Sequence, residues 1–134
     1  MNKTLWIMIA IVVVIAGIWL VSSRASRSSE SSVNTVTFAM IESELNSGAA
    51  LLYDVRTKEE YASGHFSGAK LHDLQDIQQG NYPDEEKDMK IYVYCRSGSR
   101  SSQAASALEK AGFTNIVDLG GLGKVQSMGG KLLQ

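Results

Sequence analysis

The pattern of apolar and polar positions divides the chain into three regions. Residues 5–21 form an uninterrupted apolar segment, residues 22–34 are rich in serine, and residues 35–134 alternate short apolar runs with amphipathic segments. A serine-rich stretch with few large apolar groups cannot offset the entropy lost on ordering, so residues 22–34 are predicted to be a linker. The folded domain is therefore expected at residues 35–134.

The apolar segment at residues 5–21 has the composition of a transmembrane anchor. Its 17 residues carry no charge, and at about 1.5 Å per residue they nearly span a hydrocarbon core of about 30 Å. Trp6 and Trp19 lie near its ends, where indoles favour the membrane interface. A cleaved signal is the alternative, although its apolar region would be about 7–15 residues long. We expect an uncleaved single-pass anchor. The short basic N-terminus favours an extracytoplasmic domain, and the basic residues of the linker argue against that orientation.

Within the domain, helix signals alternate with short apolar runs. Thr37 is a candidate N-cap for a first helix, and Thr57 and Glu60 form a capping box for a second. A third helix is predicted over residues 102–111, with its N-cap among the serines of residues 99–102.

Three continuous apolar runs separate these helices, at residues 49–55, 90–94 and 115–119. Such runs are typical of strands that are buried on both faces of a parallel sheet. Alternating strands and helices predict an α/β fold, a small doubly wound parallel sheet with helices on both faces.

Composition narrows the function further. The 134 residues, 44% of them apolar, suit one domain, and a net charge of −1 with both signs interspersed lacks the basic field of a nucleic-acid-binding protein. One cysteine and two histidines, His65 and His72, fall short of a usual four-ligand metal set. We therefore expect no metal, no cofactor and no nucleic-acid partner.

The single cysteine, Cys95, lies at the carboxyl end of the second predicted strand, where open α/β sheets bind ligands. The turn formed by residues 95–100 can direct backbone N–H groups inward, and the following helix adds its positive dipole end. Arg96 and Arg100 raise the local positive potential. These features predict a lowered pKa and a nucleophilic thiol, whereas an inert buried cysteine would have no use for two neighbouring guanidinium groups.

Two motifs resemble those of the rhodaneses, the thiosulfate sulfurtransferases. The loop CRSGSRS at residues 95–101 is similar to the active-site signature of that family. The stretch YDVRTKEEYASGHFSGAKLH at residues 53–72 resembles its second hallmark, Asp-x-Arg followed by an acidic-aromatic pair and Gly-His-x-x-Gly-Ala. The resemblance implies a small doubly wound α/β domain, in agreement with the periodicity.

The resemblance also implies a sulfur transfer in two steps. Cys95 would take sulfane sulfur from thiosulfate or a similar donor, hold it as a persulfide and pass it to cyanide or a thiol. The substrate-binding residues implied are those of the loop: Arg96, Ser97, Gly98, Ser99 and Arg100. Arg96 would bind the anionic donor, and the loop amides would hold the persulfide.

Three residues are predicted to support the loop: Asp54, Glu60 and Ser101. Arg100 is expected to brace it through an acidic residue, for which Asp54 and Glu60 are both candidates, and Ser101 belongs to the loop signature itself. His65 is expected to be a structural hydrogen-bond donor, because a thiolate of low pKa needs no imidazole beside it.

Two other functions remain open. Cysteine phosphatases related to the cell-cycle phosphatases have five residues between their cysteine and arginine, whereas only four separate Cys95 from Arg100, which favours a smaller ligand. A persulfide carrier or docking module is the other alternative, and a carrier would keep the same loop. The chain also departs from many rhodaneses in having no tryptophan at residues 120–130, so the rim of the pocket there is left without a prediction.

Overall fold

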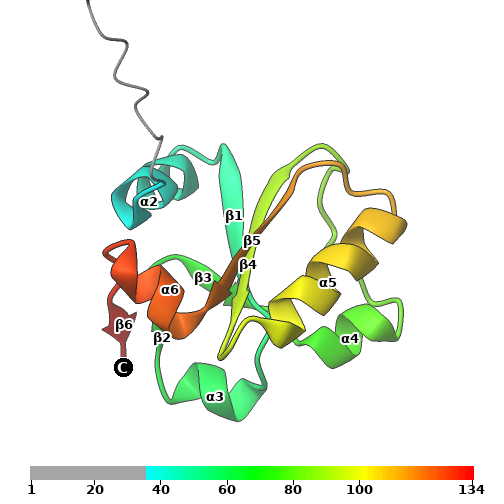
Figure 1. Cartoon of the computed structure of the whole chain (residues 1–134). Helices are drawn as coiled ribbons and strands as arrows, with labels where there is room; N and C mark the ends of the chain where they lie inside the picture. Colours follow the sequence, from blue (N-terminus) through cyan, green and yellow to red (C-terminus); the bar gives the residue numbers. More distant parts are fainter. Residues whose placement is uncertain (1–35) are drawn as a thin grey trace, which may run out of the picture. The chain divides into compact units, whose positions relative to one another are not determined.

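A computed structural model of the chain describes residues 36–134 (Figure 1). The predicted anchor at residues 5–21 and the linker at residues 22–34 lie outside the described residues and stay predictions. Within residues 36–134, no helix has both the length and the apolar composition needed to cross a membrane. These residues form one compact unit, Val36–Gln134.

A four-stranded parallel sheet forms the centre of this unit, in the order β3-β1-β4-β5 (Figure 1). The strands are β1 (Ala50–Asp54), β3 (Ala69–Leu71), β4 (Lys90–Cys95) and β5 (Ile116–Gly121). The three apolar runs of the sequence correspond to β1, β4 and β5, whereas the edge strand β3 was not predicted. The predicted α/β fold with a parallel sheet is thus confirmed.

Helices cover both faces of the sheet, as predicted. They are α2 (Phe38–Asn46), α3 (Lys58–Ala62), α4 (Leu74–Gln78), α5 (Ser99–Lys110) and α6 (Leu122–Ser127). In Figure 1, α2 and α6 lie on one side of the sheet, and α4 and α5 lie on the other. A small antiparallel pair of strands, β2 (His65–Phe66) and β6 (Leu132–Leu133), is a further feature that the sequence pattern did not indicate.

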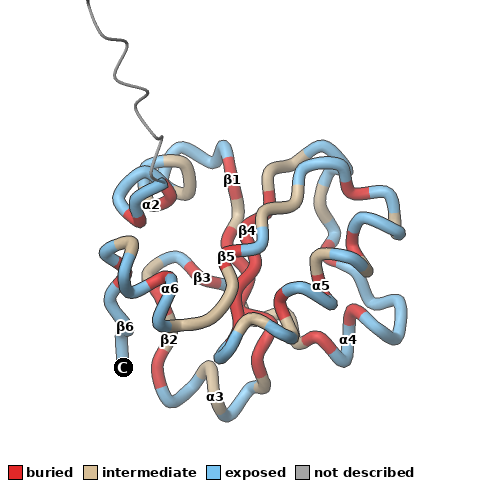
Figure 2. Tube along the Cα trace, viewed as in Figure 1, coloured by how far each residue is buried: buried red, intermediate tan, exposed pale blue. Residues whose placement is uncertain are grey.

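The alternation of side chains along β4 divides the core into two layers. Tyr92 and Tyr94 pack in the cluster with α2 and α6, whereas Ile91, Val93 and Cys95 pack in the cluster with α4 and α5. Figure 2 shows the buried residues concentrated in the strands between the helices. Cys95 therefore lies on the α5 side of the sheet, at the end of a strand that is buried almost throughout.

The helix starts agree with the sequence at two of three positions. Thr37 caps α2 by accepting from the Met40 N–H, and Thr57 with Glu60 forms the capping box of α3. The third prediction was wrong: α5 begins at Ser99, and its N-cap is Gly98 at φ +101, without a side-chain cap. The physical reason is the Cys95 thiol, which accepts a hydrogen bond from the Gly98 amide at the start of α5. The thiol thus takes the place of a capping side chain.

Candidate active site

The Cys95 sulfur lies inside a turn of backbone N–H groups. Cys95 is fully buried at the end of β4, and the Gly98 N–H donates to its Sγ at 3.0 Å. The backbone amides of Ser97 and Ser101 also point to this sulfur. Gly98 permits the turn, because its φ of +101° is a conformation that residues with a side chain rarely adopt. The turn therefore gives the Gly98 amide, at the N-cap of α5, a sulfur atom as its acceptor.

These hydrogen bonds determine the acidity of the thiol. Burial raises the pKa of Cys95, and hydrogen bonds from Ser101, Gly98 and Ser97 more than offset it, so the pKa is lowered from its usual value. The direction agrees with the prediction, but its cause differs in part. The loop amides and the Ser101 hydroxyl lower the pKa of Cys95 most, and the Arg100 guanidinium interacts with the charge of Cys95 as well.

Ser101 joins the cysteine to the loop backbone. It is fully buried in the first turn of α5, where its Oγ donates to the Gly98 carbonyl at 2.9 Å and lies 3.6 Å from Cys95 Sγ. The Gly120 carbonyl lies 3.4 Å from the same hydroxyl. Ser101 thus contacts both the loop backbone and the cysteine, and its role in supporting the loop stays a prediction.

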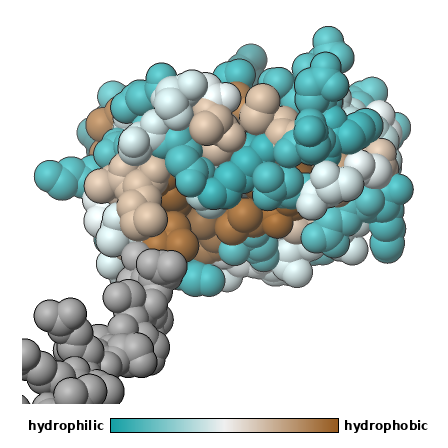
Figure 3. Space-filling view, turned by 90° about the horizontal axis from the view of Figure 1, so that it is seen from above, coloured by the Kyte–Doolittle hydropathy of each residue, from teal (hydrophilic) through white to brown (hydrophobic). Residues whose placement is uncertain are grey.

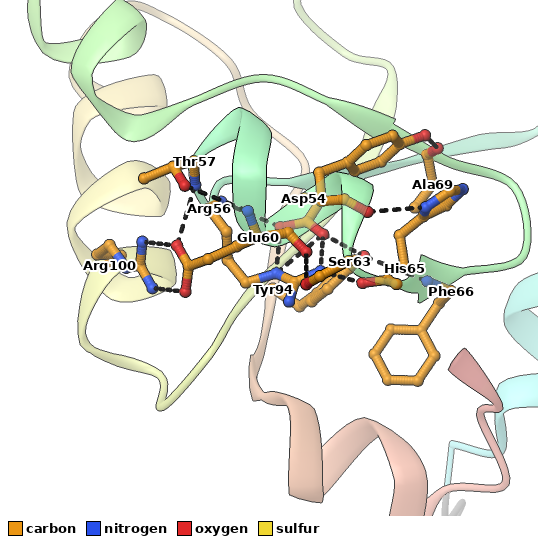
Figure 4. Close-up of polar contacts among 12 residues, drawn as sticks. Asp54, Arg56, Thr57, Glu60, Ser63, His65, Phe66, Ala69, Tyr94 and Arg100 are labelled. Atoms are coloured by element: carbon orange, nitrogen blue, oxygen red, sulfur yellow. Dashed lines mark hydrogen bonds and ion pairs between the residues drawn. The ribbon is translucent and has the colours of Figure 1, made fainter. Parts of the chain in front are cut away.

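Arg100 pairs with Glu60, one of its two predicted partners (Figure 4). Its Nη1 donates to Oε2 at 2.6 Å and its Nη2 to Oε1 at 2.8 Å, with both side chains about one quarter to one third exposed. The bond from Arg100 lowers the pKa of Glu60 to about 2, against the opposing effect of burial, with further help from the Thr57 N–H. The pair ties α3 to the start of α5 and so braces the Cys95 loop.

Asp54, the other candidate partner of Arg100, pairs with Arg56 instead (Figure 4). Arg56 Nε lies 2.9 and 3.0 Å from the two Asp54 oxygens, and Arg56 Nη2 also donates to the Gly64 carbonyl at 2.7 Å. Tyr94 Oη donates to Asp54 Oδ2 at 2.6 Å and accepts from the Phe66 N–H at 3.3 Å. Asp54 is therefore connected to the loop by its hydrogen bond from Tyr94, the residue before Cys95.

Sequence reasoning missed the parts played by Arg56 and Tyr94. Arg56 belongs to the Asp-x-Arg motif, and an arginine two residues after a buried carboxylate is a signal for a local ion pair. Tyr94 carried no such signal, because its partner Asp54 lies 40 positions earlier in the chain. Burial and the bond to Asp54 raise the pKa of Tyr94, so its hydroxyl stays protonated and donates.

Arg96 differs from the other two arginines of the site. It is exposed, and within residues 36–134 no carboxylate forms an ion pair with its guanidinium. Ser97 and Ser99 of the same loop are also exposed. An exposed arginine that has no ion pair among residues 36–134 and lies next to a thiol can bind an anion from solution, and its role in donor binding stays a prediction.

The histidines make structural contacts. His65 Nδ1 lies 3.1 Å from the Tyr61 carbonyl, and its ring stacks on that of Tyr61 at 3.9 Å. His72 Nε2 lies 2.8 Å from the Asn81 carbonyl. In the part of the chain that the structure describes, no group of three or more His, Cys, Asp or Glu side chains is arranged to hold a metal ion.

The residues that stand where many rhodaneses have a tryptophan helix belong mainly to the core. Val125 of α6 is fully buried, and Leu122 and Met128 pack against the cluster under α2. The rim of the site near α6 is thus formed by the backbone of the β5–α6 turn.

The opposite end of the sheet carries a different surface. Figure 3 views the molecule from above, toward the amino ends of the strands, and apolar surface lies there between hydrophilic residues. On another part of the surface, a cleft of about 320 Å³ lies between α2, the β2–β3 turn and the C-terminal segment, lined by Phe38, Glu42, Ser67, Gly129, Lys131 and Leu133. None of these residues belongs to the Cys95 loop, so the cleft is separate from the candidate site.

Comparison with known proteins gives a family match over most of the described residues. The family model for a Rhodanese-like domain matches residues 37–127. Thiosulfate sulfurtransferase PspE of Escherichia coli is 35% identical over 72 residues, which are 52% of this chain and 67% of that protein. The putative sulfur carrier protein YrkF of Bacillus subtilis is 30% identical over 95 residues, 70% of this chain, and the match covers only 51% of YrkF.

A solved structure agrees with the sequence match. The Alr3790 protein from Anabaena sp. superimposes with a TM-score of 0.61 at 33% identity, covering 71% of this chain and 77% of the other.

Proposed function

The chain belongs to the rhodanese-like domain family, and on this premise we propose that it is a sulfurtransferase. The proposed reaction moves sulfane sulfur from thiosulfate or a similar anionic donor to a thiophilic acceptor, through a persulfide on Cys95. One observation carries the proposal: the buried Cys95 sulfur accepts hydrogen bonds from the loop amides, which lower its pKa. The thiolate is the nucleophilic form of cysteine, so hydrogen bonds that favour it increase the reactivity of Cys95.

In the first step, the Cys95 thiolate attacks the outer sulfur of thiosulfate. The S–S bond of the donor breaks, and sulfite leaves with the electron pair. The exposed Arg96 guanidinium can orient the sulfonate oxygens by charge and hydrogen bonding. The loop amides can then stabilise the negative outer sulfur of the persulfide, because they converge on the position of Cys95 Sγ.

In the second step, the acceptor attacks the outer sulfur of the persulfide. For cyanide, a new carbon–sulfur bond forms, and the bond between the two sulfurs breaks. The Cys95 thiolate leaves with the electron pair and is regenerated. The same amides favour this step, because they lower the basicity of the departing thiolate.

The names of two relatives support two versions of this chemistry. PspE is a thiosulfate sulfurtransferase, and YrkF is a putative sulfur carrier, so a carrier that accepts sulfur without multiple turnovers is the second candidate. Two observations disfavour a cysteine phosphatase. Arg100, the arginine that would hold a phosphate, is paired with Glu60. Only four residues separate Cys95 from Arg100, one fewer than in those phosphatases.

The test is a turnover assay of the full chain with thiosulfate and cyanide. We expect thiocyanate to form over many turnovers, Cys95→Ser to abolish it, and Ser102→Ala, a change at an exposed serine beside the loop, to leave it intact. One equivalent of persulfide without turnover would favour the carrier. Normal turnover in Cys95→Ser, or Cys95-dependent hydrolysis of an aryl phosphate in the wild type, would refute the proposed reaction.

We also propose that residues 5–21 anchor the domain in a membrane and that the domain is extracytoplasmic. The length and uncharged composition of this segment support the anchor, and the short basic N-terminus supports the orientation. The full chain should stay with membranes through a carbonate wash, and a membrane-impermeant thiol reagent should label Cys95 in intact cells. Release by the wash would exclude the anchor, and labelling only after lysis would put the domain on the cytoplasmic side.

A further inference from the structure

The turn between β5 and α6 lies directly against the Cys95 loop. Ser97 and Gly121 form an isolated antiparallel bridge, and the Leu122 N–H donates to the Arg96 carbonyl at 3.1 Å. These contacts join backbone to backbone, and they involve the two loop residues that directly follow Cys95. The position of the loop is therefore coupled to the position of the turn.

An irregularity in β5 brings the turn to this position. The register pairs Val93 with Asp118 but Tyr94 with Gly120, so β5 has one extra residue near its end. Gly120, at φ +83, donates its N–H to Asp118 Oδ1 at 2.8 Å. As a result Gly121 lies opposite Cys95 in the register and contacts the loop.

Gly121 has no room for a side chain. A Cβ at this position would lie 2.9 Å from the Arg96 carbonyl oxygen and 3.0 Å from the Ser97 Cα and carbonyl carbon. All three are backbone atoms, so no side chain could rotate away to make room. The φ of −88° at Gly121 is accessible to any residue, so the requirement for glycine is one of space and not of backbone conformation.

We propose that Gly121 is a positioning residue for Cys95, because its missing side chain lets the β5–α6 turn hold the Arg96–Ser97 backbone where the loop amides point at the sulfur. The inference rests on the proposed function, since it concerns the thiol that would carry the sulfur. A methyl group at position 121 pushes this backbone away and weakens the donation from Ser97 and Gly98. The buried thiolate then loses part of what offsets its desolvation.

The test compares the thiol in the full-length wild type and in Gly121→Ala. Cys95 is the sole cysteine, so the rate of alkylation by iodoacetamide as a function of pH reports its apparent pKa directly. We expect the apparent pKa to rise by about one unit in Gly121→Ala, which lowers the alkylation rate by up to about tenfold at pH values below both apparent pKa values. An unchanged profile in a folded Gly121→Ala protein would overturn the proposal.

Two control variants separate positioning from stability. Gly123→Ala adds a methyl two residues later in α6, where nothing lies within 4 Å of the new atom. Gly112→Ala introduces backbone strain at φ +96, beyond the far end of α5 and also in open space. Both should keep the wild-type alkylation profile, while Gly112→Ala lowers the melting temperature. A pKa rise in Gly112→Ala as large as in Gly121→Ala would overturn the proposal.

A second variant tests the same contact if Gly121→Ala does not fold. Leu122→Pro removes the N–H that donates to the Arg96 carbonyl, at a helix position where proline is tolerated and after a residue with a compatible ψ of 166°. Its control, Leu122→Ala, removes the side chain but keeps the N–H. Only the proline variant should raise the pKa of Cys95, and equal profiles in the two variants would overturn the proposal.

The alkylation profile requires no sulfur donor or acceptor. A wild type that fails to turn over thiosulfate would refute the proposed function, and the effect of Gly121→Ala on the thiol could still be measured. The two failures are therefore distinguishable.

Discussion

Two arginine–carboxylate pairs near the candidate site have the same chemistry and opposite surroundings. Arg56 and Asp54 are almost completely buried, with side-chain exposures of 4% and 0%, whereas Arg100 and Glu60 are 30% and 26% exposed. The buried pair also bonds to Tyr94 and to the Gly64 carbonyl. The two pairs therefore differ in role because they differ in burial. The Arg56–Asp54 pair stabilises the fold beneath the site, and the Arg100–Glu60 pair braces the Cys95 loop at the surface.

The difference follows from the cost of leaving a charge without a partner. A charge stranded in the interior cannot regain its hydration, whereas an exposed one can. Water also screens the attraction between partly exposed charges, so such a pair contributes little to stability. Four substitutions should therefore lower the free energy of unfolding to different extents, according to how deeply the affected group is buried.

Arg56→Met should have the largest effect, because it leaves the Asp54 carboxylate buried without its ion partner. We expect a loss of about 3–5 kcal/mol in the free energy of unfolding, measured by urea denaturation. The double variant Asp54→Leu, Arg56→Met should recover part of the loss, since it removes the stranded charge as well. A loss in Arg56→Met no greater than in Glu60→Gln would show that burial does not distinguish the two pairs.

Tyr94→Phe should rank second. It keeps the ring packed against Phe66 but removes the acceptor of the buried Phe66 N–H and one donor to Asp54, at an expected cost of about 1–3 kcal/mol. Tyr92→Phe is the matched control two residues earlier on β4. Its hydroxyl donates to the partly exposed Glu44, so we expect a loss below about 1 kcal/mol. Equal losses in the two variants would contradict this ranking.

Glu60→Gln should cost less than about 1 kcal/mol at neutral pH, because the pair with Arg100 is screened by solvent. Its effect should also depend on pH. The pKa of Glu60 is lowered from 4.5 to about 2 in the folded protein, so its stabilisation is fully present above pH 4.5 and is lost as the pH falls toward 2. Urea denaturation of wild type and Glu60→Gln should therefore converge over this range. A gap that widens at low pH would contradict the assigned pKa.

Arg96→Ala should have the smallest effect on stability, within about 0.5 kcal/mol, because the exposed guanidinium has no ion-pair partner among residues 36–134. Its effect should appear in the kinetics, as a higher KM for thiosulfate, since the donor would lose a charged contact. Steady-state assays and thermal melts check both parts. If Arg96→Ala lost its fold and kept the wild-type KM, Arg96 would be the arginine that braces the loop and not the one that binds the donor.

Much of the fold could be predicted from the chain alone because the signals are local. The apolar runs of β1, β4 and β5 and the capping residues Thr37 and Thr57 each specify an element within a few positions. The short strands β2, β3 and β6 escaped prediction, because two or three residues are too few for a period to be seen. Pairing with distant parts of the chain makes them strands.

The features of the candidate site likewise fall into those that the sequence predicts and those that the tertiary structure determines. The position of Cys95 at a strand end, the glycine that its turn requires and the arginines beside it are all features of one short segment, so the sequence alone indicated a reactive thiol. The choice of Glu60 over Asp54 as the partner of Arg100, the bond from Tyr94 to Asp54 and the contact of Gly121 with the loop were decided by the tertiary structure. Each joins residues about 25 to 40 positions apart. Local periodicity carries no information about such contacts, because only the packing of the strands and helices determines which side chains meet.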